Sequence, residues 1–169
     1  MGSLSEFIRG VRVDAQVIPL QVETPSVERA AEALCVGTDR IIKSLLFQAK
    51  GGECVLVIAA GTARVDFKKL AAVTGKDRWR LAKPDVVEAV TGYPAGGTPP
   101  IGHAQKLRVL MDRKAAVLDV VYGGGGALDC MLRVRVADIR RLTGAEIHDL
   151  TEGYGRVKAD AETGIQKKA

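Results

Sequence analysis

Two apolar runs joined by a short glycine turn constrain the fold of this chain more than any other feature. The runs cover residues 41–49 and 53–60, and both are rich in aliphatic side chains. The link Lys50-Gly51-Gly52 is typical of a β-hairpin. Because the strands of a hairpin are antiparallel, this feature argues against a purely parallel sheet.

The rest of the chain alternates between helical and strand-like patterns. A chain of 169 residues most naturally forms one domain, and the alternation predicts a mixed α/β (α+β) class. Residues 1–152 are expected to form this domain, and the polar segment 153–169 to be a frayed tail. Thr24-Pro25 is expected to begin a helix that stops at Gly37. The other expected helices are 4–10, 66–75, 84–91 and 137–142, and the other expected strands are 16–22, 78–82, 107–111, 117–121 and 128–136.

Composition excludes several classes of protein. Three cysteines without a CxxC pair argue against a disulfide framework or a cysteine zinc site, and we expect buried, reduced thiols. Two histidines match no metal spacing, so neither a metal nor a cofactor is expected. No apolar run reaches the roughly 18 residues of a membrane helix, and the N-terminus does not resemble a signal peptide. A cytoplasmic protein is therefore expected.

Positive charge is concentrated in one part of the chain. Residues 39–83 hold ten basic and four acidic side chains, a net +6, whereas the whole chain carries +5. Such clustering is typical of a surface that binds phosphates, although a solvated lysine-rich face has the same pattern. Aromatic residues make up only 4%, fewer than a protein that stacks many bases normally has.

Lys43 is the first candidate site residue. In a strand it shares a face with Ile41, Leu45 and Phe47, where a charged group is poorly placed for solvent. The lysine therefore either lines a pocket that holds an anion or guards an edge strand against aggregation. The pattern by itself does not decide between these two roles.

Two glycine-rich segments are the other candidates. Residues 92–102 contain four glycines and three prolines, a composition that suits a rigid loop with backbone N–H groups aimed at an oxyanion or phosphate. Residues 123–126 are four consecutive glycines, typical of a flap or of a wall that a ligand approaches closely. Asp129 follows them and could orient a substrate amine. An ordered surface loop and a flexible hairpin tip remain alternatives for the two segments.

Together these motifs resemble the YbaK family, which includes the editing domain inserted in bacterial prolyl-tRNA synthetase and free-standing relatives. The resemblance covers roughly residues 27–150 and depends on IIKSLLF, TGYPAGGTPPIGH and GGGGALDCMLRVRVADIRRLTG in that order. It implies a partly closed mixed β-sheet surrounded by helices. It also implies an aminoacyl-tRNA deacylase, an enzyme that hydrolyses the ester between a wrong amino acid and the terminal adenosine of tRNA.

The resemblance assigns roles to individual residues. Lys43 falls at the family's catalytic lysine, where it would hold the phosphate or ribose of the adenosine and not act as a nucleophile. Gly96 and Gly97 would supply the N–H groups that stabilise the oxyanion. The expected substrate-binding residues are Ser44, Thr98, Pro99, Pro100, Ile101, Gly102, His103, Gly124 and Asp129.

The substrate is the least determined part of this interpretation. YbaK itself has serine before the loop proline and no histidine at the loop's end, whereas this chain has Thr98 and His103. We therefore expect a small amino acid such as alanine on tRNA for proline, with prolyl-tRNA synthetase as a candidate partner and the oligomeric state undetermined. The alternatives are a Cys-tRNA(Pro) deacylase like YbaK and a non-catalytic tRNA-binding module.

Overall fold

The predicted hairpin lies in the larger of two β-sheets in the computed structural model, which describes residues 2–153. Strand β2 (Ile42–Gln48) pairs antiparallel with β3 (Cys54–Ala60) along its whole length. The sheet has the order β4-β2-β3-β5-β8, in which β3–β5 and β5–β8 are parallel pairs. The other strands are β4 (Arg80–Leu81), β5 (Arg108–Asp112) and β8 (Glu146–His148). The sheet is therefore mixed, as the hairpin indicated.

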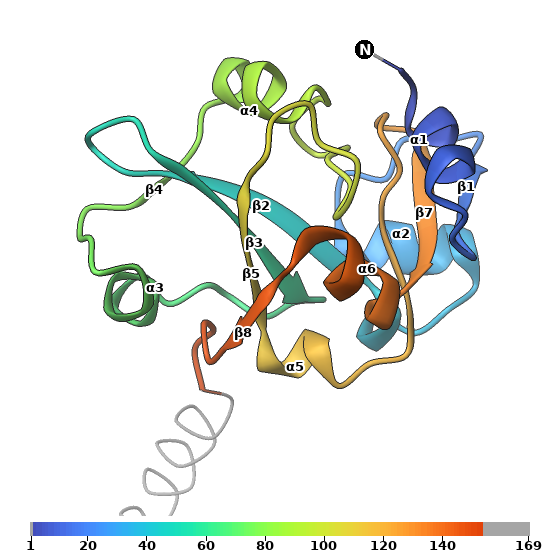
Figure 1. Ribbon diagram of the computed structural model, residues 1–169. Coiled ribbons are helices and arrows are strands. Elements are labelled where there is room, and N and C mark those ends of the chain that lie inside the picture. The colour runs from blue at the N-terminus through green and yellow to red at the C-terminus, as the bar shows by residue number, and fades with distance from the viewer. Residues whose placement is uncertain (1, 154–169) are drawn as a thin grey trace, which may run out of the picture.

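A second, antiparallel sheet has the order β1-β7-β6. Its strands are β1 (Gln16–Pro19), β6 (Val120–Gly124) and β7 (Cys130–Arg135). A single parallel bridge between Ile41 and Tyr122 connects it with the larger sheet. The mixed α/β class is thus confirmed. The expected partial closure of the sheet is not observed, because the strands form two open sheets that meet beside β2 (Figure 1).

Short helices surround the sheets (Figure 1). Helix α1 begins with a capping box formed by Ser3 and Glu6, and Asp66 caps α3 by accepting from the N–H groups of Lys68 and Lys69. The helices are α1 (Leu4–Val11), α2 (Val27–Leu34), α3 (Phe67–Thr74), α4 (Pro84–Thr91), α5 (Arg113–Ala116) and α6 (Val136–Thr143), with a 3₁₀ turn η1 (Thr38–Arg40).

The two faces of β2 and β3 are buried in different clusters. The main core lies between the sheets and contains Ile42, Leu56 and Ile58 from the larger sheet and Leu132 from the smaller. On the opposite face Phe47, Val55 and Val57 pack against α3 and the segment that ends at Leu150. Successive residues of one strand point to opposite faces, so the two clusters alternate along the sequence.

Several sequence predictions were wrong in detail. Helix α2 is capped by the Ser26 hydroxyl, not by Thr24, and it ends at Cys35, which adopts the left-handed conformation expected at Gly37. The main-chain N–H of Thr24 is instead bonded to Leu128 O, a contact far away in the sequence. The cysteines are less buried than predicted, because Cys35 is exposed and the other two are half-buried.

The segment after β5 was also misassigned. Residues 117–121 were expected to form a strand, but Asp112 caps the short helix α5 and the strand begins only at Val120. Val117 remains 82% exposed as a consequence. Strand β8 was not predicted, and the expected tail beyond Gly153 lies outside the described residues.

Candidate functional site

Lys43 lies on strand β2 and lines a cavity of about 1100 Å³. Its side chain leaves the strand on the face of Leu45 and Phe47, as the alternation predicted. Arg64 and Lys68 also line this cavity. The remaining lining residues are Val65, Asp66, Phe67, Lys69, Leu81, Glu152 and Gly153.

The ammonium group of Lys43 has an unusual electrostatic environment. Partial burial lowers its pKa below the ordinary value, the charge of Arg64 lowers it further, and the carboxylate of Glu28 acts in the opposite direction. The side chain of Lys43 makes no ion pair or hydrogen bond within residues 2–153. A half-buried cation beside a second cation favours an anionic ligand, because such a ligand would compensate both charges.

The glycine–proline segment 92–102 is an ordered loop held by its own side chains and main chain. Gly97 N–H and the Thr98 hydroxyl both donate to Pro94 O, at 3.0 and 3.2 Å. His103 Nε2 lies 2.7 Å from Pro99 O, which makes this nitrogen the protonated one in the neutral ring. Burial lowers the pKa of His103, and the bond to Pro99 opposes this effect. His103 therefore braces the loop from within.

The glycine run 123–126 is the surface on which this loop rests. Gly126 N–H donates to Gly97 O at 2.8 Å. A Cβ atom on Gly124 would lie 2.7 Å from the carbonyl carbon of Thr98, and one on Gly97 would lie 2.9 Å from the carbonyl carbon of Ala127. The glycines therefore permit two backbones to touch, and the interpretation of the run as a free flap was wrong.

The glycine–proline loop and the side chain of Lys43 lie on opposite faces of β2. A Cβ atom on Gly123 would lie 3.2 Å from Ile42 Cγ1 and 3.6 Å from Pro100 Cδ, so the loop lies on the Ile42 face of the strand. Ser44 shares that face, and its hydroxyl oxygen is buried without a hydrogen-bond partner among the described residues. No residue of segments 96–102 and 123–129 is among those that line the cavity beside Lys43.

Segment 20–28 lies near both the glycine–proline loop and Lys43. Thr24 N–H donates to Leu128 O at 3.2 Å, and Leu128 lies 3.3 Å from the position of a Cβ on Gly96. From the same segment, Glu28 influences the ammonium of Lys43. One short segment therefore lies close to Lys43 through Glu28 and, through Leu128, close to the loop residue Gly96.

The remaining predicted site residues are buried in the core, form a turn or are exposed. Ile101 is fully buried in the main core, and Gly102 has the positive φ angle that its turn requires. Asp129 is exposed, and its main-chain oxygen accepts from Leu20 N–H at 2.7 Å. No cluster of three or more His, Cys, Asp or Glu side chains that could hold a metal occurs within residues 2–153.

Sequence reasoning missed four residues around Lys43. Glu28, Arg64, Phe67 and Lys68 come from three separate segments, and no motif marked them. The only available signal was the excess of positive charge in residues 39–83, to which two of the four, Arg64 and Lys68, contribute. No helix in the described part of the chain has the length and apolarity needed to cross a membrane.

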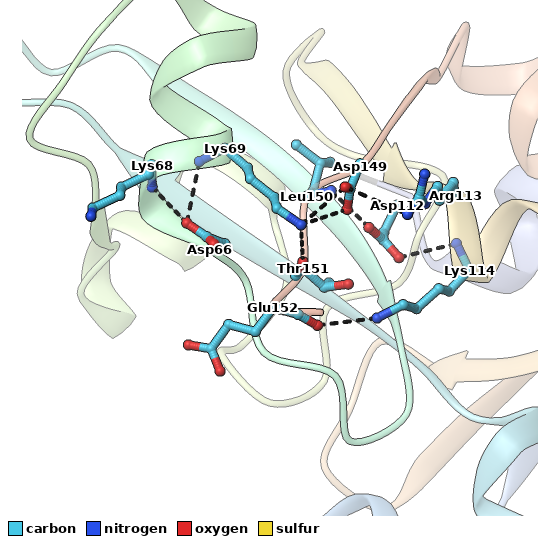
Figure 2. A network of polar contacts seen from close by, with 10 residues as sticks. All are labelled: Asp66, Lys68, Lys69, Asp112, Arg113, Lys114, Asp149, Leu150, Thr151 and Glu152. Carbon is cyan, nitrogen blue, oxygen red and sulfur yellow. Dashed lines mark hydrogen bonds and ion pairs between the residues drawn. The ribbon is translucent and has the colours of Figure 1, made fainter. Parts of the chain in front are cut away.

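The cavity wall is held by a polar network that fastens residues 149–152 (Figure 2). Lys69 Nζ contacts both oxygens of Asp149 at 3.0 Å and Thr151 O at 2.8 Å. The buried carboxylate of Asp112 accepts from Leu150 N–H at 2.8 Å and from Lys114 N–H at 3.0 Å. This network fixes one side of the cavity before any ligand binds.

Comparison with known proteins identifies the family. The model of the aminoacyl-tRNA editing domain matches residues 21–142, and the chain belongs to this family. It is 28% identical over 131 residues to "Uncharacterized protein YwhH" of Bacillus subtilis, covering 78% of this chain and 83% of that protein. It is 26% identical over 126 residues to the Enterococcus faecalis protein named "Putative Cys-tRNA(Pro)/Cys-tRNA(Cys) deacylase EbsC", covering 75% and 77%.

The chain also resembles part of a larger enzyme and two solved structures. It is 37% identical over 95 residues to "Proline--tRNA ligase" of Nitratidesulfovibrio vulgaris, covering 54% of this chain and 16% of the ligase. The crystal structure of "hypothetical protein APE2540" matches with a TM-score of 0.81 at 30% identity, covering 88% of this chain and 99% of that one. The structure of "a putative trans-editing enzyme for prolyl tRNA synthetase" matches with 0.75 at 32% identity, covering 82% and 87%.

Proposed function

We propose that this chain is a trans-editing aminoacyl-tRNA deacylase. It hydrolyses the ester of a mischarged tRNA, with a small amino acid such as alanine on tRNA for proline as the preferred substrate. The observation that supports this proposal most is the ammonium group of Lys43, which is half-buried, lines a large cavity and has no partner among residues 2–153 of a chain of the editing family.

Lys43 acts as an anchor in this proposal. Its charge holds the phosphate or ribose of the terminal adenosine, since a lysine ammonium is a compact point charge with three donors. The lowered pKa does not make it a nucleophile, because an aminoacyl ester is already activated and needs only a placed water and a stabilised oxyanion. Arg64 adds a second positive charge beside it.

The backbone of the glycine–proline loop provides the oxyanion donors in this proposal. Gly97 N–H already donates to Pro94 O, so Gly97 contributes shape, by allowing close contact with Ala127. Gly96 and Thr98 have N–H groups without an acceptor among residues 2–153. Removing one preorganised donor of this kind typically costs about 3–4 kcal/mol of transition-state stabilisation.

The decisive experiment is a deacylation assay with Lys43→Ala. We expect loss of deacylation with an unchanged melting temperature, because the fold already disfavours the charged form of this lysine. Lys43→Arg keeps the charge and serves as the matched variant, and we expect it to retain part of the activity. Full activity in a folded Lys43→Ala protein would refute the proposal.

A panel of mischarged tRNAs tests the substrate. Alanine, cysteine, serine and threonine esters on tRNA for proline are compared with cysteinyl-tRNA for cysteine, because one relative is named for both cysteinyl substrates. We expect the alanyl ester to react fastest. Binding of every tRNA without hydrolysis of any would favour the alternative of a non-catalytic tRNA-binding module.

The proposed substrate also suggests the cellular compartment and the protein partner. Aminoacyl-tRNA is used in the cytoplasm, so the protein is proposed to act there. The similarity to a segment of proline–tRNA ligases supports prolyl-tRNA synthetase as a partner. Copurification of the two proteins with and without tRNA tests this association.

A further inference from the structure

The cavity beside Lys43 has more room and more positive charge than one aminoacyl ester requires. Its volume of about 1100 Å³ exceeds the roughly 300–1000 Å³ that is usual for small-molecule sites. It extends from Lys43 along β2 to Phe47, four residues further, which is about 13 Å in a strand. A ligand that fills it is therefore longer than an amino acid joined to one ribose.

Phe67 is the unusual side chain at the far end of this cavity. The chain has only three phenylalanines, and this one is 50% exposed. Its ring packs edge-to-face on the buried ring of Phe47, with the centroids 5.7 Å apart and an angle of 83° between the planes. Phe67 is also the first residue of α3, directly after the cap Asp66, so the backbone that carries the ring is fixed. An ordered and half-exposed aromatic ring is suited to stack on a planar ligand.

Basic side chains line the same cavity as this ring. Lys68 and Arg64 line the same cavity, and neither makes an ion pair within the described part of the chain. The neighbouring Lys69 differs, because Asp149 and Thr151 O occupy its ammonium. Two carboxylates, Asp66 and Glu152, also line the cavity, so its four basic side chains outnumber the acidic ones by two.

We propose that Phe67, Lys68 and Arg64 bind the unpaired 3′ end of the tRNA. A base of that end stacks on the ring of Phe67, and Lys68 and Arg64 contact its phosphates. Single-stranded nucleic acid is the ligand class that combines a planar apolar face with a regular negative charge, and this site offers both complements within one cavity. This inference rests on the proposed function, because it concerns the same substrate and the same cavity.

The polar network of Figure 2 explains why such a site is preorganised. Asp66 N–H donates to Leu150 O at 2.8 Å, and Val65 forms an isolated bridge with Thr151. The segment that carries Arg64 and Phe67 is thus fastened to residues 149–152 on one side and to Phe47 on the other. A ring held in this way loses little conformational entropy when a base stacks on it.

The test compares the affinity of two uncharged transcripts, an intact tRNA for proline and the same tRNA without its last three nucleotides. The wild-type protein is expected to bind the intact tRNA more tightly. Phe67→Leu is expected to weaken binding of the intact tRNA by about 5- to 150-fold, the range for loss of one stacked base. The same variant is expected to leave binding of the shortened tRNA unchanged. Phe67→Trp keeps a ring and should restore the preference.

Two control variants make the result specific. Val117→Ala truncates an exposed apolar side chain outside this cavity and should not change the affinity for either tRNA. Lys68→Ala should reduce the slope of log K against log salt by about one, whereas Lys50→Ala, which removes the same charge from the hairpin turn, should not.

The proposal is overturned if the folded Phe67→Leu protein keeps the wild-type preference for the intact tRNA, or if the wild-type protein shows no such preference. Because uncharged tRNA is used, this result does not depend on hydrolysis. A protein that prefers intact tRNA through Phe67 but deacylates nothing would retain the binding site and lose the proposed enzymatic function.

Discussion

The contact between the glycine–proline loop and strand β6 can be tested by adding one methyl group. In Gly124→Ala the new Cβ would lie 2.7 Å from the carbonyl carbon of Thr98 and 2.9 Å from that of Gly97, and closer still to Thr98 O. Ordinary contacts of a Cβ begin at 3.4 Å. The backbone of the loop must therefore move by 3.4 − 2.7 = 0.7 Å or more.

This displacement has a cost in stability. The obstructing atoms belong to the main chain, so no side-chain rotation relieves the clash. Overpacking of this kind typically costs about 1–3 kcal/mol. For a chain of 169 residues we expect a decrease in melting temperature of about 2–12 °C, measured by circular dichroism.

The same displacement should reduce catalysis. A misplacement of about 1 Å in a preorganised site can lower the rate by about 100-fold. We therefore expect a decrease in deacylation of up to about 100-fold at a temperature where the variant is folded. Gly51→Ala is the matched control, because Gly51 also lacks a positive φ angle but has no atom within 4 Å of the added Cβ. If the two variants have equal melting temperatures and equal activity, the explanation of the glycine run is refuted.

Three further predictions concern the elements that support the site. Asp112→Ala leaves Leu150 N–H without an acceptor and should lower the free energy of unfolding by about 2–4 kcal/mol in urea titrations; a loss below about 1 kcal/mol would contradict this. The pKa of His103 is lower in the folded protein than its ordinary value of 6.5, so the stability of the fold should fall as the pH decreases below 6.5. His103→Gln should lack this component of the pH profile of the melting temperature. An identical profile in both proteins would contradict the proposed role of His103 in holding the loop. Arg108 holds the pKa of Glu146 at about 2, against 4.5 ordinarily, so the pair stabilises the fold above pH 4.5 and this contribution disappears as the pH falls through about 2. Because both side chains are largely exposed, Glu146→Gln should lower the free energy of unfolding by less than about 1 kcal/mol at neutral pH. The variant should not show the loss of stability in acid that the wild-type pair shows.

Local sequence patterns predicted most of the secondary structure correctly. The hairpin, the cap at Asp66, the proline at the start of α4 and the glycine at its end are short-range features, and each appears as expected. The errors arose where distant contacts compete with local preferences. The N–H of Thr24 bonds to Leu128 O, so the cap of α2 passes to Ser26.

Three features of this protein could be recognised from the order of its residues alone: a mixed sheet, a lysine on an apolar strand face, and a loop rich in glycine and proline. These properties depend on neighbouring residues, whose spacing is visible in the sequence. The resemblance of three motifs indicated the family, and the comparisons confirm it. The assignment of the individual site residues remains a proposal.

The spatial relation between these features could be learned only from the folded chain. Ile42 and Lys43 are adjacent in the sequence, yet one faces the loop and the other faces the cavity with Arg64, Phe67 and Lys68. The glycine run serves as a seat for the loop because two backbones more than twenty residues apart come into contact there. Such contacts depend on the pairing of distant segments, and no local pattern of residues specifies which segments will meet.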